Sequence, residues 1–257
     1  MDEKDIVKQI FSKNKASYIT SSTHANKQDL QEMINWLEPA SEMNVLDIAT
    51  GGGHVAKHLS PYVAKVTATD LTEAMLTNTA SHLQAYNNIT FTVADAEDLP
   101  FENDTFDIVT CRIAAHHFPN PKAFLAEVAR VLTPAGKFLL IDNVAPNEPT
   151  LDHFYNTFEK MRDPSHVRAR SIAEWKNMFE HQPMRMIKQT SRKKTLPFQE
   201  WAKRTLATKA EVQHVENYLM NAMKYIRNYF QIDIKKGHIQ SFAIDEWMVL
   251  CKQENEQ

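Results

Sequence analysis

The run Val45–Gly53, VLDIATGGG, decides how the chain folds, because an apolar strand pattern passes directly into three of the chain's five glycines. The amphipathic residues 54–60 follow at once, so the stretch predicts a strand, a glycine turn and a helix. Ordering a glycine costs more conformational freedom than ordering any other residue, so three in a row mark a sharp bend or a close approach to another group. We therefore expect a ligand at this turn.

Two phosphate-binding loops share this layout, and neither matches it well. A P-loop continues with Lys and then Ser or Thr after its last glycine, whereas His54 and Val55 follow Gly53. A dinucleotide-binding fingerprint has a third glycine where this chain has Ala56. Asp47, on the strand before the turn, also suits a cation better than a pyrophosphate. These differences make an NAD(P)-dependent oxidoreductase a weak hypothesis for this chain.

Acidic residues close the next two strand patterns as well. Asp70 ends the run 64–70, where an open α/β sheet places a carboxylate against a ribose diol. Asp95 follows the run 89–94. Ligands of such sheets bind beyond the carboxyl ends of the strands, so we expect one ligand to contact Asp47, Asp70 and Asp95.

The rest of the pattern alternates strands with helices, which predicts a doubly wound, mostly parallel α/β sheet. Beyond Pro149 the alternation loosens into helices broken by two strand patterns. The expected helices are 4–15, 30–37, 72–86, 121–132, two within 151–182, and 198–230. The further strands are 106–111, 137–141, 184–196 and 239–252, with a break at residues 134–136.

Five stretches now carry a family resemblance. VLDIATGGGHVA, VTATD, VADAEDLPF, FDIVTCRIAAHHF and RVLTPAGKFLLID resemble, in this order, the motifs of class I S-adenosylmethionine-dependent methyltransferases of type 11. This UbiE-like group contains the ubiquinone and menaquinone biosynthesis C-methyltransferases. The motifs span residues 40–145, with a looser likeness to residue 257. The resemblance implies a Rossmann-like, seven-stranded sheet with an antiparallel last strand, and helical insertions in the C-terminal half that form the acceptor pocket.

The resemblance also implies a cofactor, S-adenosylmethionine, which leaves as S-adenosylhomocysteine, and the residues that hold it. Asp47 and the turn 50–53 would hold the methionine moiety, and Asp70 the ribose hydroxyls. Leu71 and Met75 would cover one face of the adenine. The family usually has Gly in place of Ala49, a departure that some members share. The full expected set is Asp47, Ala49, Thr50, Gly51, Gly53, Asp70, Leu71, Met75, Asp95, Ala96, Glu97 and Arg112.

His116 and His117 are the candidate catalytic residues. They follow the fourth strand at the ligand edge, and imidazole has an unperturbed pKa suited to removing a proton at neutral pH. The alternative is that one of them packs or caps the turn before Pro119, because neighbours on a turn seldom face the same site. No further pair of ligands has metal-binding spacing, so we expect no metal.

Residues 160–209 are strongly basic, with 13 Lys and Arg against 4 Asp and Glu, although the whole chain carries a net charge of −3. Three readings stay open. In the first, the cations cover a solvated face and protect an edge strand at 192–194 from pairing with another sheet. In the second, they bind an anionic acceptor. In the third, they bind RNA, which the scattered aromatic residues make unlikely. Acceptor contacts, or ordinary surface and capping polarity, are expected at Tyr18, His24, Asn143, Asp163, His166, Arg168 and Arg170.

Composition sets the outer limits. A chain of 257 residues with 43% hydrophobic and 24% charged residues is typical of a globular protein. We expect one methyltransferase domain, 1–257, with an N-terminal helical segment 1–40, a cofactor-binding core 41–145, and a helical cap with the last two strands at 146–257. A polar start, two distant cysteines and no long apolar run favour a cytoplasmic protein without a membrane span.

The sequence therefore predicts an S-adenosylmethionine-dependent methyltransferase that transfers a methyl group to a small-molecule acceptor by direct displacement. An intrinsically good leaving group lets alignment in a dry pocket supply most of the acceleration. The alternatives are a non-catalytic protein that binds the same cofactor for regulation and, more weakly, the oxidoreductase. The oligomeric state, a homo-oligomer included, is left open.

Overall fold

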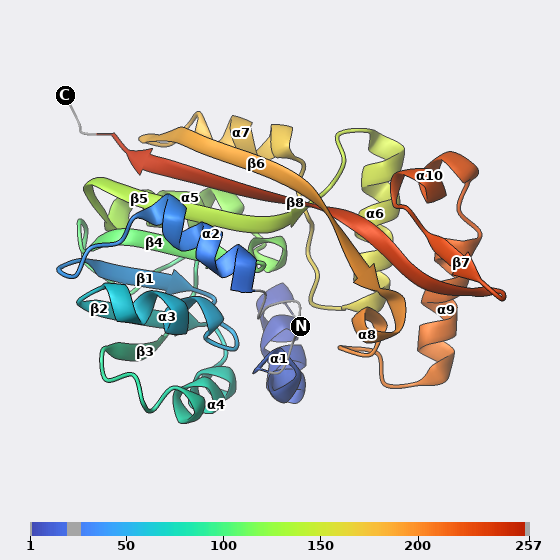
Figure 1. The fold of residues 1–257 in the computed structure, drawn as a ribbon, viewed down its shortest axis with the longest axis horizontal. Coiled ribbons are helices and arrows are strands. Elements are labelled where there is room, and N and C mark those ends of the chain that lie inside the picture. The colour runs from blue at the N-terminus through green and yellow to red at the C-terminus, as the bar shows by residue number, and fades with distance from the viewer. Residues whose placement is uncertain (1, 20–26, 255–257) are drawn as a thin grey trace.

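The computed structural model describes residues 2–19 and 27–254 (Figure 1). Helices and strands alternate as the sequence predicts. The strands are β1 Asn44–Ile48, β2 Lys65–Asp70, β3 Ile89–Val93, β4 Phe106–Arg112, β5 Leu132–Val144, β6 Met184–Pro197, β7 Asp233–Lys235 and β8 His238–Gln253. The α-helices are α1 Glu3–Ile19, α2 Lys27–Leu37, α3 His54–Leu59, α4 Glu73–His82, α5 Pro121–Val131, α6 Pro149–Arg162, α7 Ile172–Phe179, α8 Phe198–Ala202, α9 Lys209–Met220 and α10 Lys224–Tyr229, and the short 3-10 helices are η1 Ser60–Tyr62 and η2 Ala115–His117.

One mixed sheet organises the molecule, with the strand order β3-β2-β1-β4-β5-β8-β6. β1 to β5 pair in parallel, and β8 lies antiparallel to both β5 and β6. The predicted doubly wound, mostly parallel sheet with an antiparallel last strand is therefore confirmed. An eighth short strand, β7, was not predicted. It forms a hairpin with β8 through Lys236 and Gly237, whose φ angles of 51° and 77° suit a tight hairpin turn.

Helices cover both faces of the sheet, so its central strands are apolar on both sides. Phe124 of α5 and Trp175 of α7 pack on one face, against Val109 and Leu140. The other face is covered by α2 and α3, whose buried side chains form a second cluster with β1 and β2. Figure 1 shows these helices flanking the sheet. The parallel strands thus all end at one edge, where the candidate site lies.

Local signals place most helix starts correctly, while one predicted break is wrong. α5 begins with Pro121, and the side chain of Asn120 accepts a hydrogen bond from the backbone N–H of Ala123. Residues 134–136 were expected to interrupt the chain before a strand, but they lie within β5. The strand accommodates them because the register between β4 and β5 shifts there, with Ala135 at φ 66°.

A third hydrophobic cluster lies beyond the sheet, in the cap. It joins α6, α8, α9 and α10 to the outer halves of β6 and β8, with Phe158, Trp201 and Phe242 fully enclosed. Figure 1 shows β6 and β8 running from the sheet into this helical part, with α1 at the junction. The cap is therefore held to the sheet by continuous strands.

No described helix combines the length and hydropathy needed to cross a bilayer.

The basic edge strand β6 is largely neutralised by its neighbour. Arg192 and Lys194 both bond Glu246 of β8, and Lys193 lies 3.0 Å from Asp245. The prediction that residues 192–194 lie on an edge strand is confirmed, since β6 ends the sheet. Their charges are mostly used in cross-strand pairs.

Candidate functional site

A cavity with about 990 Å³ of empty space, its open mouth included, lies at the carboxyl edge of the parallel strands. Ten of the twelve predicted cofactor residues line it. Gly53 and Met75 do not. The side chain of Met75 is fully buried, so its contact with the adenine stays a prediction. The lining residues are Lys4, Val7, Phe11, Asp47, Ala49, Thr50, Gly51, Gly52, His54, Val55, Asp70, Leu71, Ala94, Asp95, Ala96, Glu97, Arg112, Ile113, Ala114, His117, Phe118 and Pro119.

The glycine turn shapes one wall of this cavity. Gly51 has φ 52°, and a Cβ added there would meet no atom of the described chain within 4 Å. Gly53 has φ 74°, and a Cβ there would lie 2.6 Å from side-chain atoms of Leu83 and Thr79. Gly51 thus leaves room for a ligand, whereas Gly53 lets the turn pack against α4. Ala49 adopts φ 52°, which is a strained conformation for a residue with a Cβ.

Asp47 lies beneath the turn and is almost completely buried. Its carboxylate accepts hydrogen bonds from the hydroxyls of Thr50, at 2.6 Å, and Thr110, at 2.8 Å. Burial raises the pKa of Asp47 to about 6, although these hydroxyls and Arg112 favour the charged form. A bound cation would stabilise the carboxylate further.

Asp70 ends β2 and also holds the turn in place. Its two oxygens accept from the backbone N–H groups of Gly51, at 3.2 Å, and Thr72, at 2.9 Å. Burial raises the pKa of Asp70, while these N–H groups oppose the rise. The carboxylate still borders the cavity, where a diol could donate to its remaining lone pairs.

Helix α1 forms a side of the cavity that the sequence did not reveal. Lys4, Val7 and Phe11 line the cavity from this helix. The ammonium of Lys4 lies 2.5 Å from Asp95 and 2.7 Å from Glu97. The helix itself was predicted, but its weak amphipathic pattern gave no sign of what it covers.

A second cavity, with about 510 Å³ of empty space, adjoins the first. The two share Phe11, Ile113 and His117 as lining residues, so these three border both cavities. Its polar lining mixes cations and acids, and Trp201 adds an aromatic wall. The lining residues are Phe11, Ile113, His116, His117, Asn143, Glu159, Arg162, Asp163, Lys194, Leu196, Trp201, Arg204 and Ile244.

Both predicted histidines lie in η2 at this boundary, and their environments differ. Burial, with the neighbouring His116, lowers the pKa of His117 to about 4, and its Nδ1 lies 2.9 Å from the carbonyl oxygen of Ser165. His117 is therefore neutral at pH 7. The Nδ1 of His116 lies 2.7 Å from Asp142. Burial lowers the pKa of His116, but this carboxylate outweighs it and the pKa is raised.

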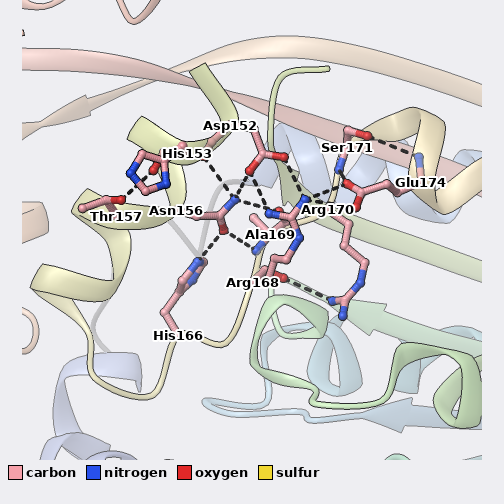
Figure 2. A network of polar contacts seen from close by, with 10 residues as sticks. All are labelled: Asp152, His153, Asn156, Thr157, His166, Arg168, Ala169, Arg170, Ser171 and Glu174. Atoms are coloured by element: carbon pink, nitrogen blue, oxygen red, sulfur yellow. Dashed lines mark hydrogen bonds and ion pairs between the residues drawn. The ribbon is translucent and has the colours of Figure 1, made fainter. Parts of the chain in front are cut away.

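Three predicted acceptor contacts lie outside both cavities, in the network of Figure 2. Arg168 binds Asp152 through two bonds of 2.8 Å and Glu174 at 3.0 Å. Nε2 of His166 lies 2.9 Å from Oδ1 of Asn156. Arg170 bonds the carbonyl oxygen of Arg168 at 3.3 Å. His166 and Arg168 tie α6 to the segment before α7, and Arg170 bonds within that segment, so we no longer assign the three to the acceptor.

The other predicted acceptor contacts divide into two groups. Asn143 and Asp163 line the second cavity, as expected. His24 and the side chain of Tyr18 are outside the part of the chain that the structure describes. Sequence reasoning missed Lys194, Trp201 and Arg204, which α8 and its flanking segments bring to the cavity. The basic composition of residues 160–209 was the only signal for Lys194 and Arg204, and it did not indicate Trp201.

Comparison with known proteins identifies the family of this chain. Residues 46–140 match the methyltransferase domain family. YcgJ of Bacillus subtilis, an uncharacterized methyltransferase, is 40% identical over 239 residues, which cover 91% of this chain and 94% of YcgJ. The crystal structure of YcgJ superposes with a TM-score of 0.84 at 35% identity, over 89% of this chain and 99% of that chain.

A ubiquinone/menaquinone biosynthesis C-methyltransferase, UbiE of Rickettsia massiliae, is 33% identical over 129 residues, or 47% of this chain and 52% of that protein. The predicted family resemblance is thereby confirmed. The matched methyltransferase domain, residues 46–140, includes the glycine turn and the strand-end acids. The chain therefore belongs to the S-adenosylmethionine-dependent methyltransferases and, within them, to the family of Bacillus subtilis YcgJ.

Proposed function

We propose that the larger cavity binds S-adenosylmethionine and that the second cavity binds the small molecule that receives the methyl group. The proposal rests on the wall that the two cavities share. Phe11, Ile113 and His117 border both cavities, so a methyl group at this wall has an acceptor site beside it. When bound, the cofactor supplies an electrophilic methyl group on a sulfonium.

The residues of the larger cavity fit the parts of that cofactor. Asp47 and the open side of Gly51 suit the cationic methionine end, and Arg112 provides a positive charge for its carboxylate. Asp70 suits the ribose hydroxyls. The adenine would lie against the other lining residues that were predicted for it, Leu71, Asp95, Ala96 and Glu97.

The chain's own contribution to the reaction is alignment in a site shielded from water. Phe11 of α1 closes the boundary from one side, and its ring lies 5.1 Å from that of His117 in an edge-on contact. His117 is neutral at pH 7, so it adds no charge that would repel a sulfonium. Holding the two reactants in line removes much of the entropic barrier of a displacement.

We further propose that the acceptor is anionic. The second cavity has three cationic side chains, Arg162, Lys194 and Arg204, against the two acids Glu159 and Asp163. A cavity of this small size suits a small molecule better than a nucleic acid, which needs a broad basic surface with stacking aromatic residues. We also propose a cytoplasmic location. The buried free thiols of Cys111 and Cys251 support it, because disulfides are rare in the cytosol.

Ligand-induced stabilisation tests the cofactor assignment. S-adenosylmethionine and S-adenosylhomocysteine are expected to raise the melting temperature, because a ligand at a hundredfold excess over its Kd adds about 2.7 kcal/mol. NAD serves as the control and is expected to have no effect. Equal stabilisation by NAD would contradict the proposal.

Asp70→Ala tests the ribose contact. The variant removes the acceptor that the ribose hydroxyls would use, so cofactor affinity is expected to fall about tenfold or more. Isothermal titration measures the affinity, and circular dichroism checks that the variant remains folded. An unchanged Kd would remove Asp70 from the site.

A further inference from the structure

We infer that Asp142 and His116 form a catalytic pair at the second cavity. Asp142 positions the imidazole, and Nε2 of His116 removes a proton from an acceptor that is methylated on oxygen or nitrogen. The inference rests on the proposed function, because it concerns the acceptor bound beside the cofactor. It narrows the acceptor to molecules with an O–H or N–H nucleophile.

Hydrogen bonds fix the orientation of His116. One oxygen of Asp142 lies 2.7 Å from Nδ1, and the other accepts from the backbone N–H of His116 at 2.9 Å. The backbone carbonyl of His116 accepts from the N–H groups of Val167 and Arg168, each at 3.0 Å. A carboxylate only accepts, so Nδ1 carries the proton, and the neutral ring keeps its basic lone pair on Nε2.

The basic nitrogen belongs to the ring that borders the second cavity. His116 lines that cavity, whereas Asp142 lies behind it with a side chain only 2% exposed. Within the described part of the chain, no side chain or backbone group is hydrogen-bonded to Nε2. An acceptor in the cavity can therefore reach it.

A second polar atom in the same cavity also needs a donor. Oδ1 of Asn143 is buried and has no hydrogen-bond partner among the described residues. A buried acceptor without a hydrogen-bond partner destabilises the protein, and a bound N–H or O–H would satisfy it. Asn143 follows Asp142 directly in β5 and lines the cavity with His116. Both atoms thus point to a ligand that donates hydrogen bonds.

The charges around His116 suit a base that works near neutral pH. The groups around it are Asp142 from β5, Glu159 and Arg162 from α6, and the rings of His117 and His166. Burial lowers the pKa of His166 to about 2, so it stays neutral like His117. Asp142 and Glu159 raise the pKa of His116 against burial and Arg162. An imidazolium formed during turnover is therefore stabilised mainly by Asp142.

The transfer step balances without a further reactant. A lone pair on the acceptor oxygen or nitrogen forms the new bond to the methyl carbon. The carbon–sulfur bond breaks, and its electron pair stays on sulfur to give S-adenosylhomocysteine. The acceptor proton passes to Nε2 of His116 and later to solvent. A thiolate or an already formed carbanion would need no such base.

Histidine NMR tests the pair without knowledge of the acceptor. The protein, labelled with ¹⁵N-histidine and saturated with S-adenosylhomocysteine, is titrated with acid, and His116→Gln assigns the signal. The neutral ring is expected to carry its proton on Nδ1, and Asp142→Asn is expected to lower the pKa of His116. Asp152→Asn, which removes a carboxylate outside both cavities, is the control. A neutral ring protonated on Nε2, or a pKa unmoved by Asp142→Asn, would overturn the inference.

Turnover gives the second test. The probes are 4-hydroxybenzoate, 3,4-dihydroxybenzoate and 4-aminobenzoate, which combine an O–H or N–H with a carboxylate, incubated with methyl-labelled S-adenosylmethionine. Asp142→Asn is expected to lower kcat by about 10²–10⁴-fold, with KM nearly unchanged and a shifted acid limb of the pH profile. Asp142→Glu should restore part of kcat, which a merely structural defect would not allow.

The outcomes separate the inference from the function on which it rests. Failure to bind S-adenosylmethionine or S-adenosylhomocysteine would overturn the proposed function itself. Transfer to carbon or sulfur, with kcat unaffected by His116→Gln, would overturn the inference alone. If none of the three probes is methylated, the NMR result decides.

Discussion

Gly53→Ala is the sharpest test of how the glycine turn is built. Gly53 has a left-handed backbone, with φ 74°, and is the N-cap residue of α3. A methyl group there would approach Cδ1 of Leu83 and Cγ2 of Thr79 to 2.6 Å. Both neighbours are buried, and the hydroxyl of Thr79 is held by the carbonyl oxygen of Gly51 at 2.6 Å. The turn therefore has little room to adjust.

The expected loss of stability has two parts. A left-handed conformation costs a residue with a Cβ about 1–2 kcal/mol, and overpacking a buried contact costs about 1–3 kcal/mol. We expect Gly53→Ala to lower the free energy of unfolding by about 3 kcal/mol. For a chain of this size that corresponds to a fall of about 6–12 °C in Tm.

Gly51→Ala is the matched control. Its φ of 52° imposes a similar backbone strain, but the added methyl would enter open space in the cofactor cavity. We expect a loss of only about 1–2 kcal/mol in stability, with at least a tenfold weaker affinity for S-adenosylmethionine. Urea unfolding and isothermal titration on both variants make the comparison. If Gly53→Ala proved no less stable than Gly51→Ala, the packing argument would fail.

Two further variants test other parts of the structure. Burial raises the pKa of Asp47 from 3.8 to about 6, so its ionisation destabilises the unliganded fold by about 3 kcal/mol as pH rises through this range. Asp47→Asn should remove that loss, so the stability of the variant relative to the native protein should grow between pH 4 and pH 7. The cofactor affinity of the variant should fall. Parallel curves of unfolding free energy against pH for the two proteins would contradict the argument. Arg168→Met breaks the ion pairs with Asp152 and Glu174, which are partly exposed, so thermal unfolding should show a loss of only about 1 kcal/mol. The Kd for S-adenosylmethionine should not change, and a large change would return Arg168 to the site.

The cofactor edge could be predicted from the sequence because each of its parts is local. A strand, the turn and the next acid follow one another in the chain, and parallel strands bring Asp47, Asp70 and Asp95 to one edge whatever the details of packing. Met75 does not line the cavity, because its side chain is fully buried in the fold, and the weak amphipathic pattern of α4 does not specify which of its residues meet the cavity.

The second cavity could not be predicted in the same way, because its walls come from distant segments. Lys194 reaches it only through the register of β6 with β8, and Trp201 only through the packing of the cap. Arg168 seemed equally suited to an anion. Its two carboxylate partners, 16 positions before it and 6 after it, become visible only once α6 and α7 are placed (Figure 2).

The basic excess of residues 160–209 is much smaller in the folded protein than the composition suggests. Arg192, Lys193 and Lys194 pair with β8, and Arg168 pairs with Asp152 and Glu174. The second cavity is lined by three cations against two acids, but Lys194 is one of these cations and is already paired with Glu246, so little net positive charge is left there before His116 is counted. Asp142 balances the charge that His116 gains when it takes a proton. A singly charged acceptor, such as a carboxylate, therefore matches this cavity better than a dianion, and the cavity stays near neutrality throughout the transfer.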